Sequence, residues 1–251
     1  MRVVYLVTQT NGGLLHYTAQ LANSVSKYAD VTVIGPQKLP NNYFSKNIKM
    51  VNVFDCPIGK NIIKSLSFKN VNCVDKIKPD IIHITIPHII MLIFSFIYRQ
   101  EKKYPMVLTK HDPKPHVGKY LSEAMADVIN GLIKYERIIV HSEKHKDILI
   151  KRDFISEKIV AVPHGDYSFF VNYEKKSEVE KNTILFFGHI RKYKGLEYLI
   201  KAVPLISKEI SNLKVIIAGD GDFSRYSKLI TDNSKFKIWP LFPLSLSTDI
   251  L

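Results

Sequence analysis

The stretch from residue 3 to residue 25 reads VVYLVTQTNGGLLHYTAQLANSV and contains the pattern that repeats along the chain. Its first five residues are all apolar, which is typical of a strand buried on both faces of a parallel sheet. A glycine turn at Asn11-Gly12-Gly13 follows. After the turn, one helical face collects Leu14, Thr18, Leu21, Ala22 and Val25. This spacing predicts an amphipathic helix directly after the strand and the turn.

Strands and helices continue to alternate through the rest of the sequence. Short apolar runs predict further strands at residues 31–34, 50–54, 81–86, 106–109, 137–141, 158–163, 184–188 and 215–219. A polar segment at 172–182, NYEKKSEVEKN, interrupts the pattern and is typical of a linker. We therefore expect an α/β protein with two Rossmann-like doubly wound domains: residues 1–171, the linker 172–182, and an incomplete second domain at 183–251 with about three strands.

Composition places the chain among ordinary globular proteins. It has 251 residues, of which 46% are hydrophobic and 24% charged, and this excludes a disordered or fibrous polymer. The two cysteines, Cys56 and Cys73, form neither a disulfide framework nor a zinc motif, so a reducing, cytoplasmic location is expected. The net charge of +13 favours an anionic partner, which is a nucleic acid, a phosphorylated small molecule or an acidic membrane surface, unless it is only a solvated surface.

One apolar stretch is long enough to raise the question of a membrane span. Residues 81–98, IIHITIPHIIMLIFSFIY, carry no formal charge. Eighteen such residues just reach the length that a spanning helix requires. Pro87 and the histidines at 83 and 88 lie in its first half, so a buried strand at 81–86 followed by a buried helix from about His88 is the preferred interpretation.

Candidate functional residues follow the predicted strands, because doubly wound sheets bind ligands beyond the carboxyl ends of their strands. Gly12 and Gly13 follow the first strand and would let a ligand approach the backbone closely. His111 follows the strand at 106–109 and can donate a hydrogen bond to a sugar hydroxyl or a phosphate, with Asp112 orienting the ring. An ordinary turn and a structural capping pair are the alternatives at these two positions.

The second half has a more specific arrangement of charge. Residues 188–195 read GHIRKYKG, so three cations precede a predicted helix whose free N–H groups also favour an anion. A guanidinium, an ammonium and backbone donors together can hold a diphosphate without a metal, although a basic surface loop would look the same. The next strand leads into Gly219-Asp220-Gly221-Asp222, whose acids could contact a ribose or cap the following helix.

These motifs, taken in order, resemble glycosyltransferase family 4, the retaining, nucleotide-sugar-dependent enzymes of the GT-B fold. The resemblance extends from residue 1 to about residue 226. Its five motifs are Gly12-Gly13, Thr109-x-His111-Asp112, Ala161-Val162-Pro163-His164-Gly165-Asp166, Phe187-Gly188-x5-Lys194-Gly195 and Ile217-Ala218-Gly219-Asp220-Gly221. The resemblance implies two Rossmann-like domains, with the acceptor mainly on the first and the donor mainly on the second.

The resemblance also implies roles for single residues. Lys194 matches the lysine that meets the donor diphosphate, and Arg191 would replace the usual arginine, whose position is taken by His189. His111, beside Asp112, matches the histidine near the transferred sugar. Gly12 and Gly13 match the loop at the donor phosphates, and Gly195, Gly219 and Gly221 complete the expected donor-binding set. Neither a metal nor a cofactor is implied, since the nucleotide sugar is itself a substrate.

The end of the chain departs from the family pattern. The paired glutamates of the family, E-x7-E, do not occur, and residues 239–251 do not follow the pattern, so a truncated chain is expected. The preferred function is transfer of a sugar from a nucleotide-sugar donor to a glycan, polysaccharide or lipid-linked hydroxyl, at the inner face of a membrane with an anionic surface. The alternative is an inactive remnant that binds a phosphorylated ligand or nothing. A nucleic-acid partner is not expected, because the chain has a single tryptophan and no recognised RNA motif.

Overall fold

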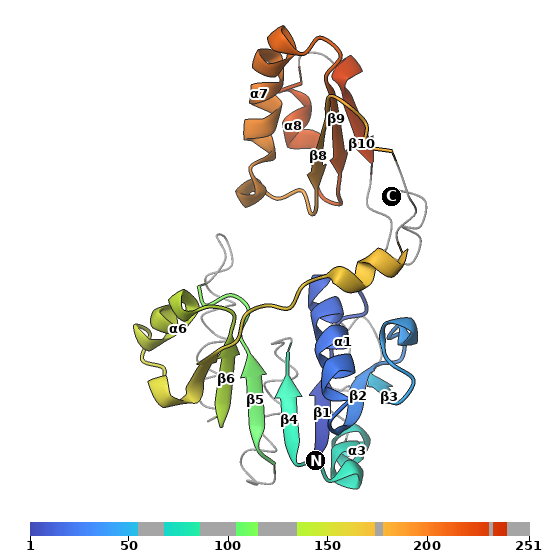
Figure 1. Cartoon of the computed structure of the whole chain (residues 1–251), viewed down its shortest axis with the longest axis vertical. Helices are drawn as coiled ribbons and strands as arrows, with labels where there is room; N and C mark the ends of the chain where they lie inside the picture. The colour runs from blue at the N-terminus through green and yellow to red at the C-terminus, as the bar shows by residue number, and fades with distance from the viewer. Residues whose placement is uncertain (55–67, 86–103, 115–134, 174–177, 231–232, 240–251) are drawn as a thin grey trace. The chain divides into compact units, whose positions relative to one another are not determined.

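The computed structural model describes residues 1–54, 68–85, 104–114, 135–173, 178–230 and 233–239. The chain divides into two compact units, Met1–Asp166 and Tyr167–Leu251. Each unit has its own parallel sheet with helices beside it (Figure 1). The division thus falls a few residues before the segment 172–182 that the sequence suggested as a linker. The two-sheet α/β architecture expected from the sequence is confirmed.

The first unit is built on a seven-stranded parallel sheet in the order β3-β2-β1-β4-β5-β6-β7. Its strands are β1 (Arg2–Leu6), β2 (Asp30–Pro36), β3 (Lys49–Phe54), β4 (Ile81–Ile84), β5 (Met106–Thr109), β6 (Arg137–Val140) and β7 (Ile159–Ala161). Its helices are α1 (Gly13–Val25), α3 (Phe68–Ile77) and α6 (Glu143–Ile150), with short 3-10 turns at Asn41–Tyr43 and Ser156–Lys158. The chain reverses its direction of winding at β1, which places a topological switch point between β1 and β4.

Alternate side chains of the sheet enter two separate hydrophobic clusters. Val3 and Tyr5 of β1 pack with Leu15 of α1, whereas Val4 and Leu6 face the other cluster. That second cluster includes Val74 of α3 and Leu149 of α6. Because successive strand residues point to opposite faces, helices must cover both sides of this sheet. Leu15 is completely buried, and burial of such a side chain contributes about 2 kcal/mol.

The second unit holds a three-stranded parallel sheet in the order β10-β9-β8. Its elements are β8 (Thr183–Phe187), α7 (Leu196–Glu209), β9 (Lys214–Ala218), α8 (Ser224–Ser227) and β10 (Phe236–Trp239), with 3-10 turns at Ser168–Tyr173, Lys192–Lys194 and Asn233–Lys235. Leu196 and Ile200 of α7 are buried against Val215 and Ile217 of β9, as the helical spacing predicted. The third strand of this sheet, β10, was not located by the sequence analysis.

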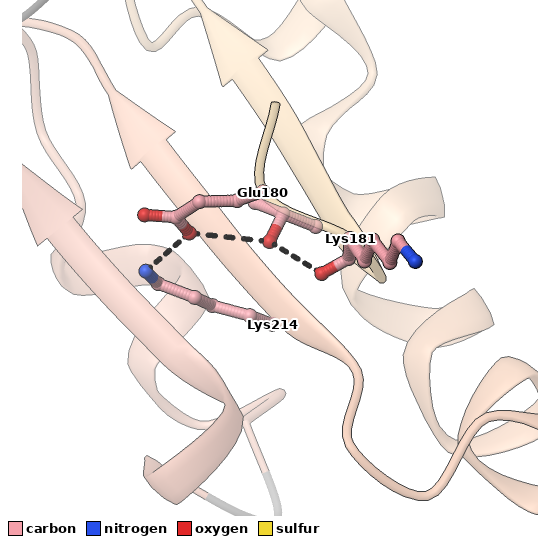
Figure 2. A network of polar contacts seen from close by, with 4 residues as sticks. Glu180, Lys181 and Lys214 are labelled. Carbon is pink, nitrogen blue, oxygen red and sulfur yellow. Dashed lines mark hydrogen bonds and ion pairs between the residues drawn. The ribbon is translucent and has the colours of Figure 1, made fainter. Parts of the chain in front are cut away.

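A polar network holds the beginning of β8 against the beginning of β9 (Figure 2). The Lys214 ammonium lies 2.5 Å from the Glu180 carboxylate, and the Thr183 hydroxyl donates to the same carboxylate at 3.3 Å. The bond from Lys214 is the main reason why the pKa of Glu180 is lowered. Both side chains are largely exposed, so the network defines the start of the strand pair more than it stabilises the unit.

The apolar stretch at 81–98 begins with a strand, as expected. Residues 81–84 form β4, which pairs with β1 on one side and β5 on the other. Across the ranges that the structure describes, helices are all too short or too polar to cross a membrane. The helix expected from about His88 lies outside the described residues.

Two loops at the carboxyl ends of β8 and β9 pack directly through their backbones. The Gly188 N–H donates to the Ala218 carbonyl at 2.9 Å, and the Ile190 N–H donates to the Asp220 carbonyl at 2.8 Å. A Cβ on Gly219 would lie 2.0 Å from the Gly188 carbonyl oxygen, and one on Gly221 would lie 2.7 Å from the Ile190 oxygen. The two loops approach this closely because Gly219 and Gly221 have no side chains.

We predict that Gly219→Ala destabilises the second unit by about 3 kcal/mol, because the added methyl group must push two backbone loops apart. Gly188→Ala is the matched control: its Cβ would meet nothing within 4 Å, so only the strain of its φ of 124° remains, about 1 kcal/mol. Chemical denaturation of the three proteins checks this order. Equal stability of Gly219→Ala and the parent would contradict the close packing of the loops.

A second prediction concerns His83 of β4, which is only 6% exposed. Its Nε2 lies 2.9 Å from the Thr109 hydroxyl, and burial, assisted by the nearby His111, lowers the pKa of His83 to about 4. In the unfolded chain the His83 side chain takes up a proton near pH 6.5, whereas in the folded protein it stays neutral until about pH 4. The free energy of unfolding is therefore unaffected by this group above pH 6.5 and decreases as the pH falls toward 4.

Between pH 7.5 and pH 4.5 we therefore expect the unfolding free energy of the parent to fall by about 2 kcal/mol more than that of His83→Gln. Glutamine is chosen because it has a similar size and keeps a polar group opposite Thr109. Urea denaturation at a series of pH values measures the slope for both proteins. An unchanged slope in the variant would mean that His83 is not the titrating group.

Candidate functional site

Parallel pairing brings the ends of four strands to one edge of the first sheet. Thr85 follows β4, His111 follows β5 by two residues, His141 follows β6, and His164 follows β7 by three. The sequence singled out His111 as a site residue and quoted His164 only within a motif. It missed His141, although the position of this histidine at the carboxyl end of the strand predicted at 137–141 is a signal that could have found it.

Gly12 lies at the switch point, between the end of β1 and the start of α1. Its φ of 86° is in the left-handed region, and a Cβ there would meet nothing within 4 Å, so the space above its backbone is open. Gly13 is the first residue of α1. The Thr18 and Thr85 hydroxyls lie 2.6 Å apart and join this helix to the end of β4. A ligand can therefore approach the backbone here closely, but a contact with donor phosphates stays a prediction.

Polar groups lie close to both ring nitrogens of His111 and define the orientation of its ring. Its Nε2 lies 3.0 Å from the Thr85 carbonyl oxygen, and its Nδ1 lies 3.1 Å from Nε2 of His141. Burial, followed by the charge of His141, lowers the pKa of His111 to about 4, so the ring is neutral at pH 7. The sequence assigned the orienting role to Asp112, whose exposed carboxylate acts on His111 as a charge that slightly raises its pKa.

An aromatic cluster surrounds this histidine. The ring of Tyr17, on α1, lies 4.6 Å from that of His111, 5.2 Å from that of His141 and 5.1 Å from that of His164, measured between centroids. Burial raises the pKa of Tyr17 and lowers that of His141. At neutral pH the rings of Tyr17, His111 and His141 are therefore uncharged.

The second unit presents its cations on the loop between β8 and α7. Arg191, Lys192 and Lys194 are exposed, as is His189. The Lys194 Nζ lies 5.4 Å from the centre of the Tyr193 ring. Gly195, with a φ of 75°, is the N-cap residue of α7, and no side chain caps this end of the helix. This is the arrangement of positive charge before a helix N-terminus that the sequence predicted.

Two further features of this unit lie close to the cationic loop. An open pocket of about 370 Å³ is lined by Lys192, Glu197, Asp222, Arg225, Tyr226 and Leu229. Gly219 and Gly221 pack against the backbone of this loop at Gly188 and Ile190, as described above. This packing explains why residues 219 and 221 are glycines. A contact of either glycine with the nucleotide-sugar donor stays a prediction.

Two family models match the sequence, and each covers most of one unit. The model of Glycosyltransferase Family 4 matches residues 11–165, and that of Glycosyl transferases group 1 matches residues 171–238. An uncharacterized glycosyltransferase of Haemophilus influenzae is 24% identical over 192 residues, which are 74% of this chain and 46% of that protein. The chain thus spans about half the length of this curated relative.

Solved structures with the same fold include proteins bound to nucleotide sugars. HepE of Anabaena, solved in complex with UDP-glucose, superposes with a TM-score of 0.70 at 17% identity, over 96% of this chain and 69% of that one. The UDP-GlcNAc 2-epimerase of Neisseria meningitidis, bound to UDP-GlcNAc, gives 0.65 at 13% identity, over 97% and 73%. At such low identity these likenesses establish a GT-B-like, Rossmann-type fold. Since the first family model covers more than half of the sequence, the chain belongs to Glycosyltransferase Family 4.

Proposed function

We propose that this chain carries the acceptor-side unit and part of the donor-side unit of a glycosyltransferase, which moves a sugar from a nucleotide-sugar donor to a hydroxyl group. The match of a glycosyltransferase family model to residues 11–165 is the observation that carries this proposal. The match of a second such model to residues 171–238 supports it. HepE was solved with UDP-glucose, and this favours a uridine nucleotide as the donor to test first.

The donor diphosphate is assigned to the loop between β8 and α7. Arg191 offers a planar pair of N–H donors and Lys194 a point charge, while the start of α7 offers backbone N–H groups to an anion. These groups stabilise the leaving diphosphate as negative charge develops on it, which is electrostatic catalysis. Because cations of the protein neutralise this charge, the diphosphate needs no metal. The exposed His189 lies at the start of the same loop and completes the donor side.

The acceptor is assigned to the edge of the first sheet where His111 and Asp112 lie. His111 is neutral at pH 7, so it acts there through hydrogen bonds and not as a fixed positive charge. Retention of anomeric configuration, and a glycan or lipid-linked acceptor, are proposed from the family resemblance alone. Gly12 and Gly13 would admit donor phosphates close to the backbone at the switch point.

Epimerisation of a nucleotide sugar is the rival that shares this fold, since UDP-GlcNAc 2-epimerases are among the similar structures. The fold does not separate the two reactions, and the two glycosyltransferase family models favour transfer. The other alternative is the inactive remnant, which is suggested by the absence of the family's glutamate pair from the sequence. Failure to bind a nucleotide would favour it.

We expect isothermal titration of the full chain with UDP to show binding that Lys194→Ala weakens roughly 10- to 150-fold. This range corresponds to the loss of one charge-assisted hydrogen bond of about 1.5–3 kcal/mol. Lys201→Ala is the matched control, because Lys201 is also exposed and lies on α7, almost two turns beyond the loop. No binding by the parent, or equal losses in both variants, would contradict the assignment.

A peripheral contact with anionic membranes is proposed from the net charge of +13. Each well-placed Lys or Arg contributes about 1 kcal/mol at such a surface, and salt screens this attraction over about 8 Å. We expect the protein to float with vesicles of phosphatidylcholine and phosphatidylserine at low salt and to be released at high salt. Flotation with pure phosphatidylcholine is the control, and equal recovery on both lipids would contradict an electrostatic contact.

A further inference from the structure

His111, His141 and His164, the histidine cluster, come from three loops of the first unit and converge at one point. One ring nitrogen of each lies within 4.8 Å of a ring nitrogen of both others. The rings lie at centroid distances of 4.9, 4.9 and 6.4 Å from one another. These loops follow the neighbouring strands β5, β6 and β7, so the parallel sheet itself brings the histidines together.

A backbone carbonyl fixes the tautomer of each ring. Nε2 of His111 lies 3.0 Å from the Thr85 oxygen, and Nδ1 of His141 lies 3.1 Å from the Val162 oxygen. Nδ1 of His164 lies 2.6 Å from the oxygen of the following Gly165. A carbonyl oxygen only accepts hydrogen bonds, so the proton of each neutral ring is on the nitrogen that faces the carbonyl. The opposite nitrogen of each ring then carries a lone pair.

The contact between two of the rings lacks a proton in these tautomers. Nδ1 of His111 and Nε2 of His141 are 3.1 Å apart, and both are the lone-pair nitrogens. Two facing lone pairs repel, so the contact requires either an additional proton or a cation.

The spacing of the rings suits a small tetrahedral metal ion. Zinc–nitrogen bonds of about 2.0–2.1 Å place the nitrogens of two histidine ligands about 3.3 Å apart and their ring centres about 5 Å apart. The His111–His141 pair already has nearly this geometry, with nitrogens 3.1 Å apart and ring centres 4.9 Å apart. The nitrogens of the three rings lie within 4.8 Å of one another, so His164, which is exposed, needs a shift of up to about 1.5 Å to reach the same point.

The surroundings of the cluster resemble those of known metal ligands. Metal-binding histidines typically donate their second N–H to a carbonyl or carboxylate, and all three rings here face a carbonyl. Asp112 adds a negative charge that acts on both His111 and His141. The ring of Tyr17 packs against all three histidines and holds them in place from α1.

From this geometry we propose that His111, His141 and His164 form a three-histidine site for a divalent transition metal that prefers nitrogen ligands, with Zn²⁺ as the best fit. Three imidazole ligands leave a fourth position for water or an oxygen ligand. The site belongs to the first unit, whereas the cationic loop assigned to the donor diphosphate belongs to the second. It replaces the expectation, drawn from the family resemblance, that the chain has no metal site.

The test uses the full chain without an affinity tag, titrated with Zn²⁺ by calorimetry and with Co²⁺ by visible absorption. We expect one equivalent of metal, and Co²⁺ bands of tetrahedral or five-coordinate nitrogen and oxygen ligation without a thiolate charge-transfer band. His141→Ala and His164→Ala should each weaken Zn²⁺ binding more than about 100-fold, beyond the 10- to 100-fold that is typical of a group that only orients a ligand.

His189→Ala is the matched control, because this exposed histidine of the second unit should leave Zn²⁺ binding unchanged. Circular dichroism checks that each variant is folded, and His164→Ala replaces an exposed side chain, so it keeps the test valid if His141→Ala unfolds. Absence of one-to-one binding at micromolar Zn²⁺, or unchanged affinity in His164→Ala, would overturn the proposal. UDP titration of the same proteins tests the proposed donor site independently of this result.

Discussion

The parallel pairing of β1 with both β2 and β4 is the constraint on which the arrangement of the first unit depends. Val4 lies opposite Thr32 on one side and Ile82 on the other, so β1 is a central strand. Since every strand pair of this sheet is parallel, all its strands end at the same edge. The loops that carry His111, His141 and His164 are neighbours for this reason, although they are far apart in the sequence.

Much of this fold could be predicted, because the strands of a parallel sheet are buried on both faces and appear as continuous apolar runs. All nine strands that the sequence located are present. One strand, β10, was not located from the sequence. In it Lys237 alternates with Phe236 and Ile238, and the residues that follow it do not match the family pattern. Such an alternating segment of four residues is difficult to separate from a loop by sequence alone.

The candidate site could be predicted less completely, since a site depends on which strands are neighbours. His111 was recognised beside its strand, but nothing in the sequence places His141 against it, because strand order is a property of the whole sheet. The family resemblance attached donor binding to Gly219 and Gly221, and the structure gives both a packing reason that the sequence could not reveal. A Cβ atom added at either position would collide with the backbone of the neighbouring loop.

Burial gives the two units different electrostatic properties. The histidines of the first unit lie at a partly enclosed sheet edge, where desolvation lowers the pKa of His111 and His141 and keeps them as neutral nitrogen donors. The cationic side chains of Arg191 and Lys194 in the second unit are exposed to water. A diphosphate requires fixed positive charge, whereas a metal ion requires lone pairs. The two proposals therefore differ in the group that each unit offers: the loop after β8 offers exposed cations to a diphosphate, and the edge of the first sheet offers histidine nitrogens to a metal ion.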